Sequence, residues 1–141
     1  MAEDSVLYWD SSAVLSVLVQ DRHSERAKES ARKKAYHLIS SLVVAEVNAV
    51  LNRMNREGYL RDVFLEAALE AFETGPWRLL RLGPHPSDMV SLARRWPLRG
   101  ADLWHLALAV RLKREDLPEL CMLTFDQRLL AAAEGENLLL P

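Results

Sequence analysis

Residues 6–15 read VLYWDSSAVL, and this segment establishes the class of fold. Its first four residues are apolar without interruption, which is typical of a β-strand covered on both faces. An aspartate and two serines follow, and these residue types often begin helices because their side-chain oxygens accept hydrogen bonds from free backbone N–H groups. The segment therefore predicts a strand, a turn and a helix, which together begin a β-α unit of a parallel sheet.

Short apolar runs alternate with amphipathic segments along the rest of the chain, as expected for repeated β-α units. The predicted strands are residues 6–9, 37–39, 79–82, 120–124 and 138–140. The predicted helices are residues 12–19, 23–33, 42–56, 61–73, 86–96, 103–112 and 128–133. The third of these is the clearest, because its apolar residues recur at helical spacing. They are Val43, Val47, Val50 and Met54, with Leu51 widening the stripe.

Length and composition favour one globular domain covering residues 1–141. Half of the 141 residues are hydrophobic and 27% are charged, without repeats or low-complexity linkers. No apolar run approaches the roughly 18 to 20 residues that cross a bilayer, and the acidic start lacks the features of a signal peptide. We therefore expect a cytoplasmic protein without a membrane partner. Cys121 is the only cysteine, which excludes an internal disulfide and a cluster of thiolate metal ligands.

Four carboxylates stand at positions that attract attention. Asp10 and Asp126 each follow an apolar strand, and such strand ends share one edge of a parallel sheet, where ligands bind. Glu46 borders the apolar stripe of its helix, and Asp102 stands at the start of another helix. Each has an ordinary structural interpretation, since aspartate is a preferred helix N-cap and Glu46 could lie on the surface. The functional interpretation depends on all four occurring together.

Convergence of these acids would favour a metal site. If the four side chains lay within about 6 Å of one another, each pair would repel by roughly 3 kcal/mol at an effective dielectric constant near 20. Such a cluster must take up protons or bind cations. Oxygen ligands without cysteine or paired histidine favour Mg²⁺ or Mn²⁺ over zinc. Such ions activate water and neutralise the leaving oxygen of a phosphodiester, which is nuclease chemistry.

The chain resembles PIN-domain proteins, and specifically the VapC-type toxins of toxin–antitoxin pairs. Four segments carry the resemblance in the family's order, at residues 7–15, 40–47, 100–109 and 123–129. The resemblance implies a three-layer α/β/α sandwich with a mostly parallel sheet. It also implies an endoribonuclease of a type II toxin–antitoxin system that uses Mg²⁺ or Mn²⁺. The implied partners are an RNA substrate, a cognate antitoxin and a second copy of the chain.

The resemblance also assigns roles to individual residues. Asp10, Glu46, Asp102 and Asp126 would be the catalytic, metal-binding quartet. Ser12 and Thr124 would be accessory polar groups near the metal. His105, one turn from Asp102, is more simply a packed or capping histidine than a metal ligand.

Basic residues near the third and fourth segments are candidates for RNA contact: Arg94, Arg95, Arg99 and Arg128. They could bind phosphates, with Trp96 as a stacking surface. A solvated basic face beside a core tryptophan would have the same sequence. The net charge of −2 does not decide between the two interpretations, because four acids neutralised by metal would leave a net positive surface.

Two alternative functions stay open at this point. A phosphohydrolase of the haloacid-dehalogenase type also begins with an acid at the end of its first strand, but it needs a second acid two residues later, where this chain has Ser12. A catalytically inactive PIN-like RNA-binding module would usually lack one or more of the four acids, and this chain retains them all. Cleavage assays with RNA and with a generic phosphate ester distinguish these possibilities.

Overall fold

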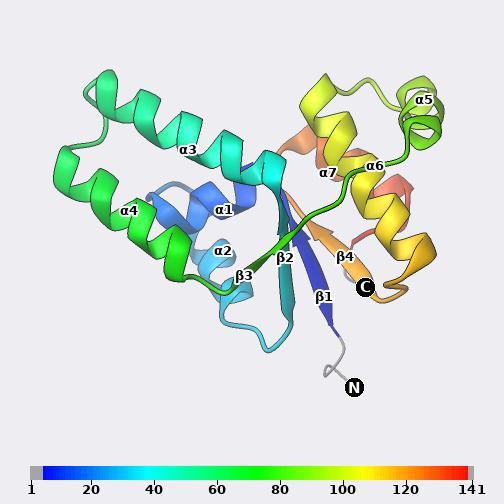
Figure 1. Ribbon diagram of the computed structural model, residues 1–141, viewed down its shortest axis with the longest axis horizontal. Coiled ribbons are helices and arrows are strands. Elements are labelled where there is room, and N and C mark those ends of the chain that lie inside the picture. Colours follow the sequence, from blue (N-terminus) through cyan, green and yellow to red (C-terminus); the bar gives the residue numbers. More distant parts are fainter. Residues whose placement is uncertain (1–4, 140–141) are drawn as a thin grey trace.

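A computed structural model describes residues 5–139 and contains a four-stranded parallel sheet in the order β3-β2-β1-β4 (Figure 1). The strands are β1 (Val6–Trp9), β2 (Tyr36–Ser40), β3 (Trp77–Leu80) and β4 (Leu120–Leu123). The helices are α1 (Ser11–Leu18), α2 (Ser24–Ala31), α3 (Ser41–Arg56), α4 (Asp62–Thr74), α5 (Pro86–Arg95), α6 (Gly100–Glu115) and α7 (Gln127–Gly135). The predicted parallel α/β architecture is confirmed.

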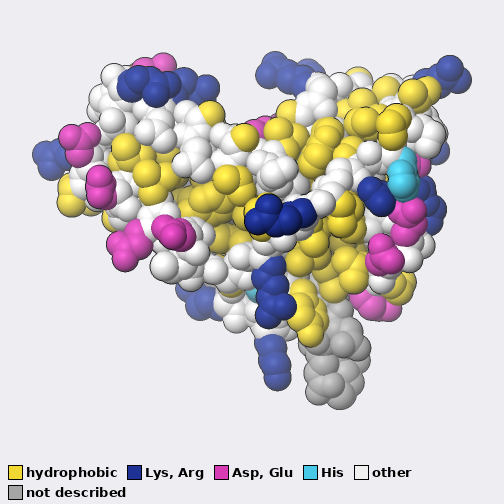
Figure 2. Space-filling view, in the orientation of Figure 1, with side chains coloured by type: hydrophobic (Ala, Val, Ile, Leu, Met, Phe, Trp, Pro, Cys, Tyr) yellow, Lys and Arg dark blue, Asp and Glu magenta, His cyan; other side chains and the backbone are white. Residues whose placement is uncertain are grey.

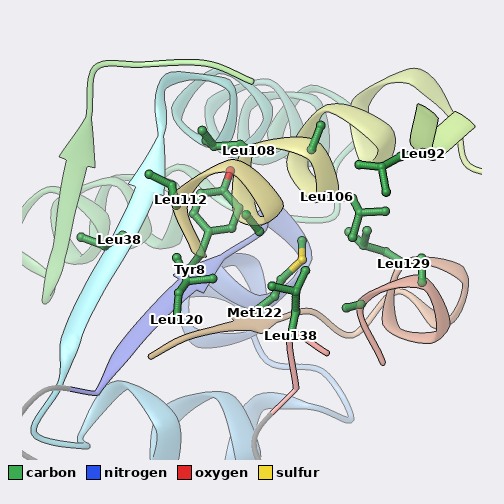
Figure 3. Close-up of a cluster of buried hydrophobic side chains, with 14 of the residues drawn as sticks. Tyr8, Leu38, Leu92, Leu106, Leu108, Leu112, Leu120, Met122, Leu129 and Leu138 are labelled. Carbon is green, nitrogen blue, oxygen red and sulfur yellow. The ribbon is translucent and has the colours of Figure 1, made fainter. Parts of the chain in front are cut away.

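Helices cover both faces of the sheet because side chains of each strand alternate between two cores. Tyr8 of β1 joins an apolar cluster with residues of α5, α6 and α7, as Figure 3 shows. Leu7 and Trp9 point the other way and pack with residues of α1, α3 and α4. The three-layer α/β/α sandwich is therefore confirmed. None of the helices in residues 5–139 has the length and hydrophobicity needed to span a bilayer.

The sheet brings the carboxyl ends of β1 and β4 together. Trp9 pairs with Leu123, and the next backbone N–H, that of Asp10, donates to the Leu123 carbonyl oxygen at 3.2 Å. β2 lies on the other side of β1 in parallel register, so its last residue, Ser40, ends at the same edge. The segments that follow these three strands thus begin side by side.

The sequence predicts a fifth strand at residues 138–140. The structure describes residues 138 and 139, and neither belongs to a strand, so the prediction is wrong for these two residues. Residues 136–138 instead terminate α7: Asn137 adopts a positive φ of 60°, and the Leu138 N–H donates to Ala133 O at 2.9 Å. Leu138 does make one ladder-like contact, because its carbonyl oxygen accepts a 2.6 Å hydrogen bond from the Met122 N–H. Residue 140 lies outside the described residues.

Most predicted boundaries lie within one or two residues of the observed ones, and the starts of two elements, β3 and α6, differ by two and three residues. β3 begins at Trp77 and not at 79, because the Trp77 ring packs edge-on against Trp9 at a centroid distance of 5.5 Å and so fixes the strand's start. α6 begins at Gly100, with the Leu103 N–H donating to Arg99 O at 2.8 Å, three residues before the predicted start. Asp102 therefore lies inside the first turn of α6.

Candidate active site

Asp10 is a buried carboxylate at the junction of β1 and α1. Its side chain is 2% exposed, and Oδ1 accepts a 2.9 Å hydrogen bond from the Ala13 N–H, so it caps α1. Ser12 Oγ donates to Oδ1 at 2.7 Å, and Thr124 Oγ1 donates to Oδ2 at 2.6 Å. Burial raises the pKa of Asp10 above its usual value, although these hydrogen bonds oppose the shift. A nearby cation would stabilise the ionised form of this group.

Ser12 and Thr124 connect Asp10 to the loop after β4. Ser12 Oγ accepts from the Phe125 N–H at 3.0 Å, and Thr124 Oγ1 accepts from the Asp126 N–H at 3.1 Å. The exposed Asp126 then caps α7 by accepting from the Leu129 N–H at 2.9 Å. The two residues predicted as accessory groups thus contact Asp10 and orient the segment that carries Asp126.

Asp102 behaves differently from the two capping aspartates. It is the third residue of α6, and the N-cap position belongs to Arg99, so the capping interpretation is wrong for this residue. Burial raises its pKa, and the negative charges of Asp126 and Glu46 raise it further. Asp102 and Asp126 line one pocket of about 340 Å³ together with Arg99 and Arg128. The structure therefore brings these two acids together.

Glu46 reaches the same region from α3. Its Oε1 lies 2.7 Å from Nε2 of His105, a fully buried residue one turn after Asp102 in α6. His105 Nδ1 lies 2.7 Å from the Tyr8 hydroxyl, which donates to Ser40 Oγ at 3.0 Å. The sequence favoured a packed or capping role for His105 over a metal-ligand role and did not predict this contact. The alternation of β1, which places Tyr8 on the α6 face, was the one signal that could have suggested it.

The four acids thus come from four separate segments and face one edge of the sheet, but they do not form a closed cluster. In residues 5–139, no three His, Cys, Asp or Glu side chains are close enough to hold a metal ion. Burial raises the pKa of both Asp10 and Asp102, and the negative charges of Asp126 and Glu46 raise the pKa of Asp102 further. The donor set is all oxygen and fits a hard divalent cation. Figure 2 shows the outline of the molecule indented between α3 and α6, above these strand ends.

The sequence profile of the PIN domain matches residues 7–135 of this chain. The chain belongs to the PIN domain family. The family resemblance inferred from the four motifs is therefore confirmed.

Solved structures share the fold of this PIN-domain protein at low sequence identity. VapC20 of Mycobacterium tuberculosis, described as a Sarcin-Ricin loop cleaving toxin, is 16% identical with a TM-score of 0.59, covering 89% of this chain and 94% of that chain. PAE2754 of Pyrobaculum aerophilum is 18% identical with a TM-score of 0.58, covering 96% and 90%. VapBC2 of Rickettsia felis, bound to a DNA fragment from its promoter, gives 12% identity, a TM-score of 0.51, and coverage of 84% and 97%. Among curated protein sequences, none matched the chain.

The four candidate RNA-binding arginines of this PIN domain divide into two pairs. Arg99 and Arg128 line the pocket that holds Asp102 and Asp126. Arg94 and Arg95 lie exposed at the end of α5, and Arg95 forms an ion pair with Glu136 at 3.1 Å.

The position of Trp96 argues against its use as a stacking surface. Its indole N–H donates to Glu136 Oε2 at 3.0 Å, and its ring packs against the core cluster and over Gly135. A Cβ atom on Gly135 would lie 2.2 Å from that ring, so the two residues are in close contact. Of the two interpretations of Trp96, the core tryptophan is therefore the better one.

Proposed function

We propose that this PIN-domain protein is a metal-dependent endoribonuclease and the toxin of a type II toxin–antitoxin system. The observation that carries the proposal is Asp102, whose pKa is raised by burial and by the charges of Asp126 and Glu46, acids from two other elements. No capping role accounts for its position. Acids whose pKa values are shifted by burial and by neighbouring charges in a pocket are candidates for functional groups. Family membership and the likeness to VapC structures support the same function.

We assign Asp10, Glu46, Asp102 and Asp126 as the groups that would hold Mg²⁺ or Mn²⁺. When bound, such an ion lowers the pKa of a water molecule and offsets charge on a phosphodiester. Asp10 is fixed for this role by Ser12 and Thr124, whose hydroxyls donate to it. The interior side of the site, where Asp10 and Thr124 lie, excludes water, since these residues are each no more than 3% exposed.

RNA is the proposed substrate, with its phosphates approaching the pocket through Arg99 and Arg128. Both guanidinium groups line the pocket that contains Asp102 and Asp126, so they could bind the phosphate on either side of the cleaved bond. Arg94 and Arg95 lie on α5, outside this pocket lining, and we assign them at most to distal phosphates. VapC20, a structural neighbour, is described as cleaving the Sarcin-Ricin loop.

We also propose two protein partners, a cognate antitoxin and a second copy of the chain, in a cytoplasmic setting. Three large apolar side chains are exposed around the α3–α4 connection: Tyr59 at 78%, Val63 at 66% and Phe64 at 55%. Phe64 also lines a groove with residues of α1. Exposed apolar side chains gathered in one region are typical of protein interfaces. One structural neighbour is VapBC2.

The test compares the purified chain with Asp102→Asn on a structured RNA, with Mg²⁺, with Mn²⁺ and with EDTA. We expect endonucleolytic fragments from the wild type with either ion, no cleavage in EDTA, and a loss of at least about 100-fold in the variant. A generic phosphate monoester should not be hydrolysed. Binding of RNA in EDTA without any cleavage in metal would instead indicate an inactive RNA-binding module, and monoester hydrolysis would indicate a phosphohydrolase.

A further inference from the structure

A chain of four polar groups crosses the apolar core between the sheet and α6. It consists of Ser40, Tyr8, His105 and Glu46, joined by contacts of 3.0, 2.7 and 2.7 Å. Figure 3 shows Tyr8 rising from β1 toward α6 among leucine side chains. Ser40, Tyr8 and His105 are each at most 1% exposed, whereas Glu46 is 28% exposed at its side chain. The buried chain therefore ends on a carboxylate that reaches the surface.

Packing alone does not explain this arrangement. Burying a hydroxyl or an imidazole costs free energy unless its hydrogen bonds are replaced, and an apolar residue would fill the same space at lower cost. His37 is a useful contrast. It is buried to a similar degree at 3% exposure, but it binds the Trp9 indole N–H and the Lys33 carbonyl oxygen, two groups outside the acidic site. The polar chain through His105 instead ends on one of the four acids.

The same chain connects the elements that carry the site. Tyr8 lies two residues before Asp10 on β1, and His105 lies one turn after Asp102 on α6. Ser40 caps α3 by accepting a hydrogen bond from the Val43 N–H at 3.3 Å, and α3 carries Glu46. A displacement of α3 or α6 relative to β1 would break at least one of these contacts.

We propose that His105 is a positioning residue that holds the Glu46 carboxylate in the orientation needed for a divalent cation. The inference rests on the proposed metal-dependent function. His105 Nε2 is hydrogen-bonded to Oε1 of Glu46. The other carboxylate oxygen, Oε2, has no hydrogen bond among the described residues and is available to an ion. A glutamate has three side-chain torsions, and fixing them before binding removes an entropic cost from metal binding. Tyr8 and Ser40 fix His105 in turn.

The experiment measures Mn²⁺ binding to the purified protein by electron paramagnetic resonance or calorimetry, with RNA cleavage measured in parallel. We expect His105→Leu to weaken Mn²⁺ binding by about 10- to 100-fold, the usual effect of removing a group that orients a metal ligand. His37→Leu is the matched control, because it also removes a buried imidazole but should leave the Mn²⁺ affinity unchanged. In a Glu46→Gln background, His105→Leu should weaken Mn²⁺ binding no further.

The outcomes separate this inference from the proposed function. If the wild type binds no Mn²⁺ and cleaves no RNA, both fall. If the wild type binds Mn²⁺ and cleaves RNA, but His105→Leu binds Mn²⁺ equally well, only the role of His105 falls. An equal loss in His37→Leu would also overturn it, since the effect would then be one of general stability. Should His105→Leu fail to fold, Tyr8→Phe decides: it keeps the ring, and unchanged Mn²⁺ affinity in that variant would overturn the proposal.

Discussion

The Thr124 hydroxyl donates a 2.6 Å hydrogen bond to Oδ2 of Asp10, from a residue 114 positions away. The same hydroxyl oxygen accepts a hydrogen bond from the Asp126 N–H at 3.1 Å. One threonine therefore links a buried acid at the end of β1 to the segment that carries an exposed acid after β4. The parallel pairing of β1 with β4 is what brings the three residues together.

Replacement of Thr124 by valine should destabilise the protein because it removes this link without changing the side chain's size. The variant removes one of the two hydroxyl donors to the buried Asp10 Oδ2, the other being Ser12, and it removes the acceptor of the Asp126 N–H. We expect a loss of about 1–3 kcal/mol in the free energy of unfolding, together with reduced cleavage. Urea unfolding in EDTA measures the first effect. Thr124→Ser keeps the hydroxyl and should retain most of the stability; an equal loss in both variants would contradict this explanation.

Replacement of Asp10 by asparagine should separate folding from activity. The amide oxygen of asparagine can still accept from the Ala13 N–H and cap α1, while the buried negative charge disappears. We therefore expect the melting temperature in EDTA to be unchanged or higher. Mn²⁺ should no longer raise it, and RNA cleavage should be lost. Undiminished cleavage by this variant would count directly against Asp10 as a metal ligand.

The metal-free protein should lose stability as the pH rises through the titration of Asp102. Burial and the charge of Asp126 raise the pKa of Asp102, so the native state keeps this proton to higher pH than the unfolded chain does. Its contribution to stability is present below the unfolded value near 3.9 and is lost as the pH rises to the raised folded value. Asp102→Asn should therefore flatten this decline in unfolding free energy, measured by urea titrations in EDTA from pH 4 to 7.

Asp88 provides a control of opposite sign. Its two carboxylate oxygens accept hydrogen bonds from Arg114 at 2.9 and 2.8 Å, and this pairing lowers the pKa of Asp88. A lowered folded pKa contributes stability above the unfolded value, and that stability is lost as the pH falls. Asp88→Asn should reduce stability at neutral pH by no more than about 1 kcal/mol, since the pair is near the surface. If Asp88→Asn and Asp102→Asn changed the pH dependence of the unfolding free energy in the same direction, the assignment of the decline to Asp102 would be refuted.

The sequence predicted the parts of the site that depend on strand ends and helix starts. Asp10 and Asp126 follow buried strands, and a parallel sheet necessarily brings such ends to one edge. Periodicity alone could not place Glu46 or Asp102 at that edge, because their positions depend on how α3 and α6 pack on the sheet. The hydrogen bond to His105 was missed for the same reason: the alternation of β1 puts Tyr8 on one face of the sheet, but it does not specify that α6 packs over that face. The four-motif resemblance supplied what periodicity lacked.

RNA binding should depend on Arg99 and Arg128 more strongly than on Arg94, because only the first two line the acidic pocket. The Asp10→Asn background, in which we expect no cleavage, permits equilibrium measurement by fluorescence anisotropy with a labelled RNA. A lost phosphate contact weakens binding and reduces the slope of log K against log salt concentration by about 0.7 to 0.9 per contact. We expect that reduction for Arg99→Ala and for Arg128→Ala. Arg94→Ala, which removes an exposed arginine from the end of α5, is the matched control and should leave the slope nearly unchanged. Equal slopes of log K against log salt concentration for all three variants would contradict the prediction. They would mean that RNA binds over the whole basic surface, and that Arg99 and Arg128 contact phosphates no more than Arg94 does.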